Sequence, residues 1–207
     1  DLHSFPTRRS SDLINVSAVL AELGVDSVAL GFIAGFTGDA IEQGVNAMGI
    51  RTDFIKLASG NSRINLKLKS EKETEINAQG PAIESDALDK LFEKLDKLHE
   101  GDVLILAGSI PKGMPHNIYE RILKLQSGKG VKTVVDASGA LLMNVLKYKP
   151  FLVKPNNFEL EEMFGVTLGG IEDIELYAGK LREMGAKNVL VSMAGDGALL
   201  LDENGSV

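Results

Sequence analysis

The segment Lys154-Pro155-Asn156 separates an apolar run that ends at Val153 from a helical pattern that begins at Glu159. A buried strand that stops here would present polar groups at the carboxyl edge of a sheet, where open α/β folds bind ligands. Asn156 can cap the helix, and Glu159 stands at the third position of a capping box. A carboxylate at this place also suits a magnesium–nucleotide complex, because Mg²⁺ prefers oxygen ligands. The spacing leaves both interpretations of Glu159 open.

A second group of polar residues lies on a segment with period-two hydrophobicity. Arg63, Asn65 and Lys67 alternate with apolar residues, so a strand would place all three on one face. Two cations beside an amide suit a phosphorylated or polyhydroxylated ligand, because Arg can bind a phosphate through two hydrogen bonds. The alternative is a solvated strand face whose charges discourage pairing with another sheet edge.

Other predicted strands also end in small or polar residues, at 108–109, 136–139 and 192–197. Ser192, Gly195 and Gly197 belong to the last of these loops. The two glycines would let a backbone approach a ligand closely, or they shape a turn. The sequence holds neither a dinucleotide-binding glycine pattern that opens a helix nor a phosphate-binding loop of the G-x-x-x-x-G-K-[ST] type.

Helical patterns and apolar runs alternate along the chain, which predicts an α/β fold with a mainly parallel sheet covered on both faces. We expect helices at 16–23, 37–48, 85–99, 118–125, 141–146, 159–164 and 176–184, and strands at 27–32, 64–68, 74–77, 103–107, 132–136, 150–153, 188–192 and 198–201. The strands at 64–68 and 74–77 follow each other without a helix between them and are expected to form a hairpin. We therefore expect an α/β core over 14–57 and 81–207, and a small β lid over 58–80.

Composition excludes several classes of protein. A net charge of −7 argues against a broad nucleic-acid-binding surface, and the absence of cysteine excludes disulfides and thiolate chemistry. No apolar stretch approaches the ~20 residues that a membrane span needs. We expect a soluble, cytoplasmic protein.

Both ends of the chain differ from the rest. Residues 1–13 are polar, lack periodicity and have no apolar signal-peptide core, so we expect a non-native tail. Asn204-Gly205 follows an apolar strand and is a hairpin-turn signal whose return strand we expect to be cut off. The chain is expected to be a fragment, truncated at both ends.

Taken together, these segments resemble the ribokinase-like (PfkB) carbohydrate kinases, and most closely the 1-phosphofructokinase and tagatose-6-phosphate kinase branch. The resemblance covers about 14–207 and rests on an ordered set of motifs, namely Ile14-Asn15-Val16-Ser17, Gly35-Phe36-Thr37-Gly38-Asp39, Ser62 to Lys67, Thr74 to Asn77, Gly108-Ser109-Ile110-Pro111, Asp136 to Gly139, Lys154-Pro155-Asn156 with Glu159, and Val191-Ser192 with Gly195 and Gly197. It implies a three-layer α/β/α sandwich and ATP-dependent phosphorylation of a sugar phosphate, most closely fructose 1-phosphate.

The resemblance also implies roles for individual residues. Asn15, Arg63 and Lys67 would hold the sugar phosphate, with Asn65 supporting them. Glu159 would order Mg²⁺ near the phosphates of ATP, through water. Lys154, Asn156, Ser192, Gly195 and Gly197 would lie along the nucleotide. The lid would close over the site to exclude water, and its exposed edges suit the pairing of two copies into a homodimer.

Three other functions stay open at this point. Tagatose-6-phosphate kinase fits the same residues, because related kinases differ by pocket shape rather than by motif. A kinase for ribose or a nucleoside is disfavoured by the two cations Arg63 and Lys67, which suit a substrate that already carries phosphate. A regulator that binds nucleotide or sugar without catalysis is a further alternative, from another class.

The catalytic base of the family belongs to a Gly-Ala-Gly-Asp motif, which does not occur among these 207 residues. Loss of a general base costs about 10²–10⁴-fold in rate, and loss of the anion hole that accompanies it adds a further factor. We therefore predict that the purified chain does not convert sugar phosphates in a coupled ADP-release assay. Measurable turnover above the rate of a no-enzyme blank would contradict this.

Overall fold

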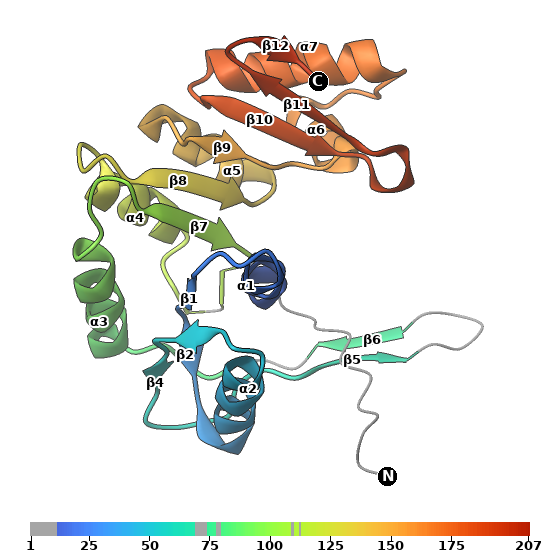
Figure 1. The fold of residues 1–207 in the computed structure, drawn as a ribbon. Helices are drawn as coiled ribbons and strands as arrows, with labels where there is room; N and C mark the ends of the chain where they lie inside the picture. Colours follow the sequence, from blue (N-terminus) through green and yellow to red (C-terminus); the bar gives the residue numbers. More distant parts are fainter. Residues whose placement is uncertain (1–11, 69–73, 78–79, 109, 112) are drawn as a thin grey trace. The chain divides into compact units, whose positions relative to one another are not determined.

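The computed structural model describes residues 12–68, 74–77, 80–108, 110–111 and 113–207, and Figure 1 shows their fold. The described residues form two compact units. Unit 1 runs up to Phe92 and includes Pro111–Met114, and unit 2 holds Glu93–Ile110 and Pro115–Val207. Most of the expected tail (1–11), the predicted polar turn at 70–73 and Ser109 lie outside the described residues.

Unit 1 begins with helix α1 (Asp12–Glu22) and has two pairs of short parallel strands, and helix α2 (Gly35–Ala47) follows the first two strands in the chain and precedes the other two. Strand β1 (Val28–Ala29) pairs with β3 (Arg51–Thr52), and β2 (Phe32–Ile33) pairs with β4 (Ile55–Lys56). The predicted single strand at 27–32 is thus divided. Gly31 lies at the break, and its carbonyl still accepts from Ile55 N at 2.8 Å. The pairing therefore continues through the interruption.

The core of unit 1 lies between these helices and strands. Ala18 of α1, Ala29 of β1, Val45 of α2 and Ile50 are buried together. Ile14, Ile41, Met48 and Phe54 pack against them. Small residues at the centre let the helices approach the strands closely.

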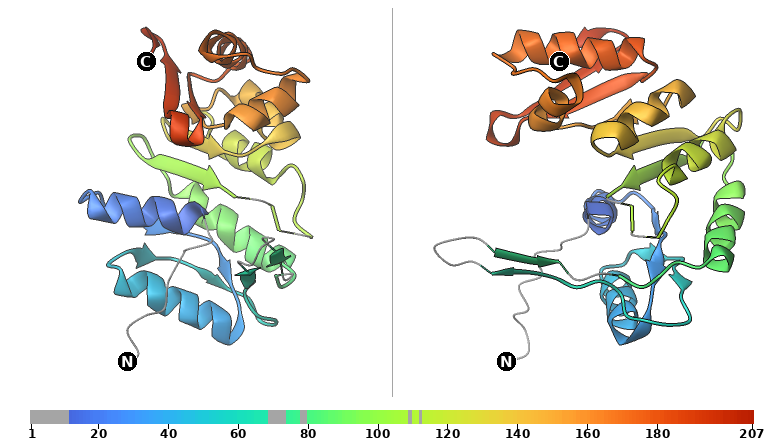
Figure 2. Two further views of the ribbon diagram at one scale, coloured as in Figure 1. Left: turned by 90° about the vertical axis from the view of Figure 1, so that its right-hand side faces the viewer. Right: turned by 180° about the vertical axis from the view of Figure 1, so that it is seen from behind.

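The hairpin of unit 1 consists of β5 (Asn65–Leu68) and β6 (Thr74–Asn77). The strands are antiparallel, with Asn65 opposite Asn77 and Leu68 opposite Thr74. Figures 1 and 2 show the pair as a separate two-stranded ribbon. The period-two pattern therefore identifies these strands correctly.

Helix α3 (Ser85–Asp96) follows the hairpin and spans the boundary between the two units. Its apolar stripe buries Ala87, Leu91 and Leu95. The helix was expected to continue to His99, but it ends at Asp96. His99 belongs to the turn that follows, where its backbone N donates a hydrogen bond to the side chain of Asp102 at 3.0 Å. Within unit 2, Gln126 Nε2 donates to Leu95 O at 2.8 Å and so secures the end of the helix.

Unit 2 is built on a six-stranded sheet in the order β12-β11-β10-β9-β8-β7. The strands are β7 (Val103–Ala107), β8 (Lys132–Asp136), β9 (Leu152–Val153), β10 (Asn188–Ser192), β11 (Ala198–Asp202) and β12 (Gly205–Ser206). Strands β7 to β10 pair in parallel, and β11 and β12 are antiparallel additions at one edge. The turn at Asn204-Gly205 thus leads into a short return strand.

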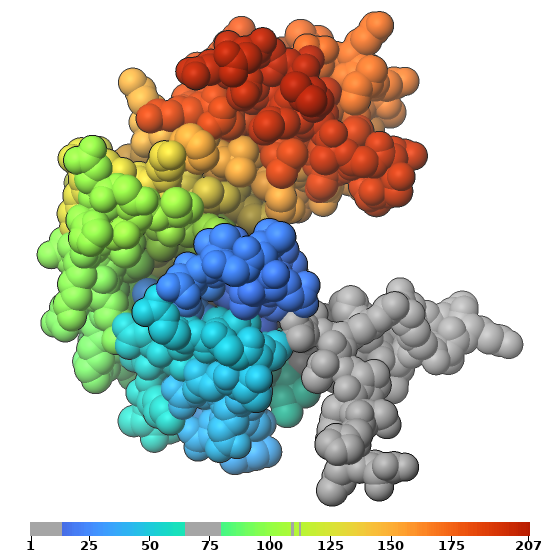
Figure 3. Space-filling model, viewed as in Figure 1, coloured from blue at the N-terminus to red at the C-terminus, as the bar shows by residue number. Residues whose placement is uncertain are grey.

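Four helices of unit 2 connect the strands, namely α4 (Ile118–Gln126), α5 (Gly139–Val145), α6 (Asn157–Phe164) and α7 (Ile171–Glu183), with a 3₁₀ turn η1 (Leu146–Tyr148) after α5. Figure 2 shows them side by side along one face of the sheet. That face is buried, and Val135, Val153, Val189 and Val191 have no exposed surface. In the space-filling view, α7 and the last strands form the orange and red surface of this unit (Figure 3).

The parallel sheet with flanking helices confirms the predicted α/β class. Strands 74–77, 103–107 and 188–192 have the predicted bounds. Helix α7 begins at Ile171 rather than at 176, because Glu172 and Asp173 belong to its first turn, where negative charge is favourable. Among the described residues, no helix is both long and apolar enough to cross a membrane.

Helix α7 offers a matched test of this packing. Leu181 has no exposed surface, whereas Leu176 of the same helix is 55% exposed. Leu181→Ala should lower the free energy of unfolding by about 2–5 kcal/mol, because it leaves a cavity in the core. Leu176→Ala should change it by less than about 0.5 kcal/mol. Urea unfolding followed by circular dichroism measures both, and equal losses would show that this face of α7 is misassigned.

Candidate functional site

The carboxyl edge of the unit 2 sheet brings several of the predicted residues together. Val153 of β9 pairs with Val135 of β8 on one side and with Val189 of β10 on the other. The next backbone groups continue this pairing, since Lys154 N donates to Val135 O at 3.0 Å. Beyond the strands, Asn156 and Ser192 form a parallel bridge, in which Ser192 N donates to Pro155 O at 3.1 Å. Lys154, Asn156 and Ser192 therefore lie at one edge.

Lys154 has a charged partner on the neighbouring strand. Its Nζ lies 3.1 Å from Oδ1 of Asp136, the last residue of β8, and both side chains are about one third exposed. Asp136 was expected only as a polar residue at a strand end. The two residues are far apart in the sequence, so the pairing depends on the register of β8 and β9. The ion pair holds a cation at the sheet edge, where a phosphate group can approach it.

Asn156 and Glu159 form a complete capping box at the start of α6. Asn156 Oδ1 accepts from Glu159 N at 2.8 Å, and Glu159 Oε2 accepts from Asn156 N at 2.8 Å. Pro155, which is fully buried, ends the strand just before the cap. The interpretation of Glu159 as a helix-capping residue is thus confirmed, and its position relative to Asn156 is fixed by two hydrogen bonds.

The donor set at this edge also fits a hydrated Mg²⁺. A carboxylate offers about four lone-pair positions, and the capping bond uses one of those on Glu159. Mg²⁺ usually keeps several waters and binds through one or two carboxylates plus substrate phosphates. Over the described part of the chain, no group of three or more acidic or histidine residues is arranged to enclose a metal ion. Glu159 is half-buried and its carboxylate keeps unused lone pairs, which matches that mode of binding.

The loop after β10 carries the two predicted glycines. Met193 N donates to Gly197 O at 2.9 Å and Asp196 N donates to Met193 O at 3.0 Å, which closes the turn η2 (Ala194–Asp196). Gly197 has φ +96°, a conformation that a side chain would strain. A Cβ added at Gly195 would meet no atom within 4 Å. The fold therefore explains Gly197, while nothing in the local packing requires Gly195, and the backbone there is open to a ligand.

Tyr119 is a residue of this edge that the sequence did not reveal. It belongs to α4, and its hydroxyl donates to the carbonyl of Gly108 at 3.0 Å. Gly108 follows β7 directly and has φ +90°. Burial, and then the negative charge of Asp136, raise the pKa of Tyr119 to about 12. Tyr119 thus fixes the turn that leaves β7 beside the Asp136–Lys154 pair.

The residues predicted to hold the sugar phosphate lie in unit 1. Asn65 and Lys67 occupy alternate positions of β5, which places them on one face of the strand. Arg63 precedes this strand and is exposed. Asn15 lies on another element, α1, and is half-buried. The structure thus places three of the four residues on one segment.

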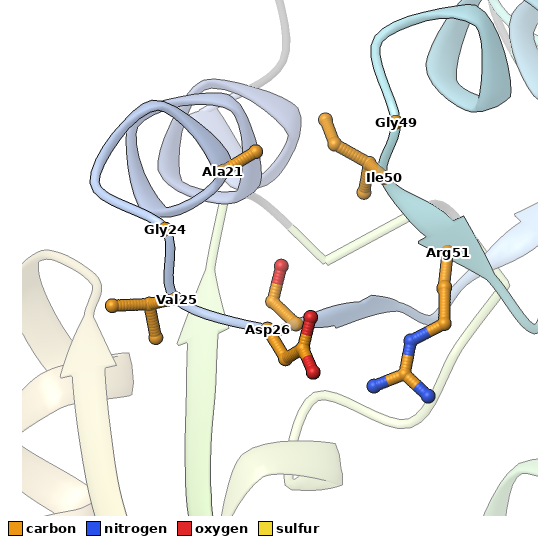
Figure 4. A pocket seen from close by; sticks show the side chains of 8 residues that line it. Ala21, Gly24, Val25, Asp26, Gly49, Ile50 and Arg51 are labelled. Atoms are coloured by element: carbon orange, nitrogen blue, oxygen red, sulfur yellow. The ribbon is translucent and has the colours of Figure 1, made fainter.

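Unit 1 also has a surface hollow of about 350 Å³, lined by Ala21, Gly24, Val25, Asp26, Ser27, Gly49, Ile50 and Arg51. Figure 4 shows the side chain of Ile50 extending toward Ala21, with the charged side chains of Asp26 and Arg51 below them in this view. Apart from Ala21 of α1, the lining residues lie just before or at the start of β1 and β3. This is the amino edge of these parallel strands, and none of the predicted site residues contributes to it.

Comparison with known proteins shows the family of this chain. The profile described as pfkB family carbohydrate kinase matches residues 12–207. The 1-phosphofructokinase of Bacillus subtilis is 46% identical over 187 residues, which cover 90% of this chain and 61% of that protein. The D-tagatose-1-phosphate kinase of Bacillus licheniformis is 37% identical over 190 residues, which cover 91% of this chain and 62% of that protein.

A solved structure supports the same relationship. A protein from Staphylococcus aureus, described provisionally as a phosphofructokinase, has a TM-score of 0.82 and 42% identity. The match covers 92% of this chain and 62% of the other. The fold is thus that of an α/β sugar kinase. The chain belongs to the pfkB family of carbohydrate kinases, and it spans about three fifths of the length of these relatives.

Tyr119 gives the site a specific response to alkaline pH. Its folded pKa of about 12 lies above the ordinary tyrosine value of 10.0, so folding favours the neutral phenol. This contribution is complete below pH 10 and is lost as the pH rises through about 12. Between these values the free energy of unfolding should fall by roughly 2–3 kcal/mol from this group. In urea unfolding at pH 9 to 12, Tyr119→Phe should show a shallower decline, and an unchanged slope would contradict the assignment.

Proposed function

We propose that this chain is part of an ATP-dependent sugar-phosphate kinase that converts fructose 1-phosphate to fructose 1,6-bisphosphate. The observation that carries the proposal is the meeting of Lys154, Asn156, Glu159 and Ser192 at one sheet edge in a member of a carbohydrate kinase family. The 1-phosphofructokinase relative, with 46% identity, supports the choice of substrate. In this family of reactions, catalysis is mainly positioning and charge neutralisation.

The nucleotide would lie along the carboxyl edge of unit 2. The ammonium group of Lys154 is held at that edge by Asp136, so little conformational freedom is lost when it neutralises the charge of a phosphate. Asn156 and Ser192 line the same edge, and the exposed backbone of Gly195 and Gly197 allows close approach. Each group is backed by a buried strand or a capped helix, and the site is therefore preorganised.

Glu159 would hold Mg²⁺ through water, since its carboxylate is oriented by Asn156 and keeps unused lone pairs. When bound, the ion neutralises charge that develops on the transferred phosphoryl group. The residues of this chain would also orient the nucleotide and exclude water from it. The base that deprotonates the sugar hydroxyl belongs to a motif that these residues do not include.

The sugar phosphate would be held from unit 1 by Arg63 and Lys67, with Asn15 and Asn65 as polar partners. A guanidinium can bind a phosphate through two parallel hydrogen bonds, and a lysine adds a point charge. The hairpin that carries these residues would act as a lid, and we propose that its edges also pair two copies of the protein. A cytoplasmic location belongs to the same proposal.

A second ketose phosphate is the main alternative substrate. The relatives named D-tagatose-1-phosphate kinase and tagatose-6-phosphate kinase are 37% and 31% identical, so proteins related to this chain differ in the sugar phosphate that they are named for. Tagatose 6-phosphate is therefore tested beside fructose 1-phosphate. The charged hairpin predicts a phosphorylated substrate in either case.

The role of the two cations can be tested in a protein extended to the length of its relatives. Arg63→Met and Lys67→Met should each raise KM for the sugar phosphate about 10–100-fold, since hydrogen bonds to charged groups contribute about 1.5–3 kcal/mol. KM for ATP should stay within about twofold, because the two substituted side chains are proposed to contact the sugar phosphate and not the nucleotide. A coupled ADP assay with fructose 1-phosphate, tagatose 6-phosphate and ribose provides the measurement.

Lys56→Met is the matched control, because Lys56 is an exposed cation of unit 1 that pairs with Asp39 and Glu42. It should leave both KM values unchanged. An enzyme that uses ribose as well as the sugar phosphates, or that keeps its KM after both cations are removed, would refute the proposed function.

A further inference from the structure

The chain just before Arg63 is attached to the start of α2 by buried polar contacts. Ala34 N donates to Ser62 Oγ at 2.9 Å, and Ser62 N donates to Ala34 O at 2.9 Å. The hydroxyl of Thr37 donates to Ser62 O at 3.0 Å. All three residues are at least nine-tenths buried. We call Ala34, Thr37 and Ser62 the polar latch.

Two glycines of α2 make this close approach possible. A Cβ at Gly38 would lie only 3.0 Å from Ser62 Oγ and 3.0 Å from Ile33 Cβ. Gly35 has φ +57°, and a Cβ there would collide with the carbonyl of Gly60 and the side chain of Asn61. The segment 60–62 therefore packs directly on the backbone of the helix start.

The same segment also contacts the chain that returns from the hairpin. A Cβ at Gly60 would lie 2.8 Å from Pro81 Cβ. Gly60 precedes β5 and Pro81 follows β6, so both ends of the hairpin meet at this point. A Cβ at Gly80 would lie 3.8 Å from Arg63 Cβ, which places Arg63 at the same junction.

From these contacts we infer that Thr37 and Ser62 are positioning residues for Arg63, and through it for the phosphate of the sugar substrate. Arg63 follows Ser62 directly and is exposed, while Ser62 is buried. The side chain of Arg63 therefore leaves from a backbone that the latch fixes. Bidentate binding of phosphate demands a defined direction of approach, and small displacements of a binding group are costly. The inference rests on the proposed function.

The apolar core of unit 1 supports this role for the latch. Ala18, Ala29, Val45 and Ile50 already bury the helices against the strands, and apolar burial is the main source of folding stability. A buried hydroxyl adds little net stability when it is paired and is costly when it is not. What the hydroxyls of Thr37 and Ser62 add is a fixed direction for the backbone at 62–63.

Thr37 provides a matched pair of substitutions. Thr37→Val keeps the shape of the side chain but removes the donor to Ser62 O, whereas Thr37→Ser keeps the donor. We expect Thr37→Val to weaken binding of fructose 1-phosphate to the protein extended to the length of its relatives about tenfold, close to one charge-assisted hydrogen bond. Thr37→Ser should stay within about twofold. Isothermal titration measures both, and thermal melting verifies that the variants are folded.

A double-mutant cycle separates positioning from general stability. In an Arg63→Met background, Thr37→Val should weaken sugar-phosphate binding by no more than about twofold, because the group that it positions is gone. ATP binding, measured on the same samples, should be unchanged. Ser62→Ala should behave as Thr37→Val does and gives a second variant if that one fails to fold.

The outcomes distinguish this inference from the proposed function. An extended parent protein that binds no sugar phosphate would refute both. An extended parent protein that binds fructose 1-phosphate, with Thr37→Val and Ser62→Ala equal to it, would overturn the inference alone. Equal losses in the presence and absence of Arg63, or equal losses for ATP, would show that the latch only stabilises the fold.

Discussion

The parallel register of β8, β9 and β10 is the constraint on which the candidate site of unit 2 depends. Val153 lies between Val135 and Val189, and all three are fully buried. A shift of one residue would turn every side chain of a strand to the opposite face, so the valines hold the register against slippage. Because strands that run in parallel end at the same edge, this register also determines where Asp136, Lys154 and Ser192 lie. Core packing therefore sets the geometry of the site.

The junction of β9 and α6 shows how one residue can serve both folding and chemistry. Pro155 ends the strand, Asn156 caps the helix, and Glu159 returns a hydrogen bond to Asn156 N. A capping residue and a metal-binding residue are often treated as alternatives. Here the cap restricts the carboxylate of Glu159 while leaving most of its lone pairs available. The structural role is thus what prepares Glu159 for the proposed contact with hydrated Mg²⁺.

Much of this fold could be predicted because its signals are local. The strands at 103–107 and 188–192 are apolar runs with clear ends, and the capping box is a spacing of three residues. The division of the first strand at Gly31 was missed, because the apolar run continues across it. The early start of α7 was missed, because Glu172 and Asp173 interrupt the apolar pattern although they favour the first turn of a helix. The pairing of Lys154 with Asp136 could not be found from spacing, since it arises only when β8 and β9 meet. Tyr119 was missed for the same reason: a tyrosine in an amphipathic helix gives no sign that its hydroxyl reaches Gly108.

The two units secure their candidate binding residues by different physical means. In unit 2 the residues stand at the ends of buried strands, so apolar packing holds them and a polar substitution at the edge leaves that packing intact. In unit 1 the segment that carries Arg63 is held by the hydroxyls of Thr37 and Ser62 and by the absence of side chains at Gly35 and Gly38. Hydrogen bonds are directional whereas apolar contacts are not. A direction-sensitive attachment suits a residue that must present a guanidinium fork to a phosphate, and a packed sheet edge suits groups that line a long polyphosphate. We therefore relate these glycines and hydroxyls of unit 1 to the proposed binding of the sugar phosphate, and the apolar core of unit 1 to folding.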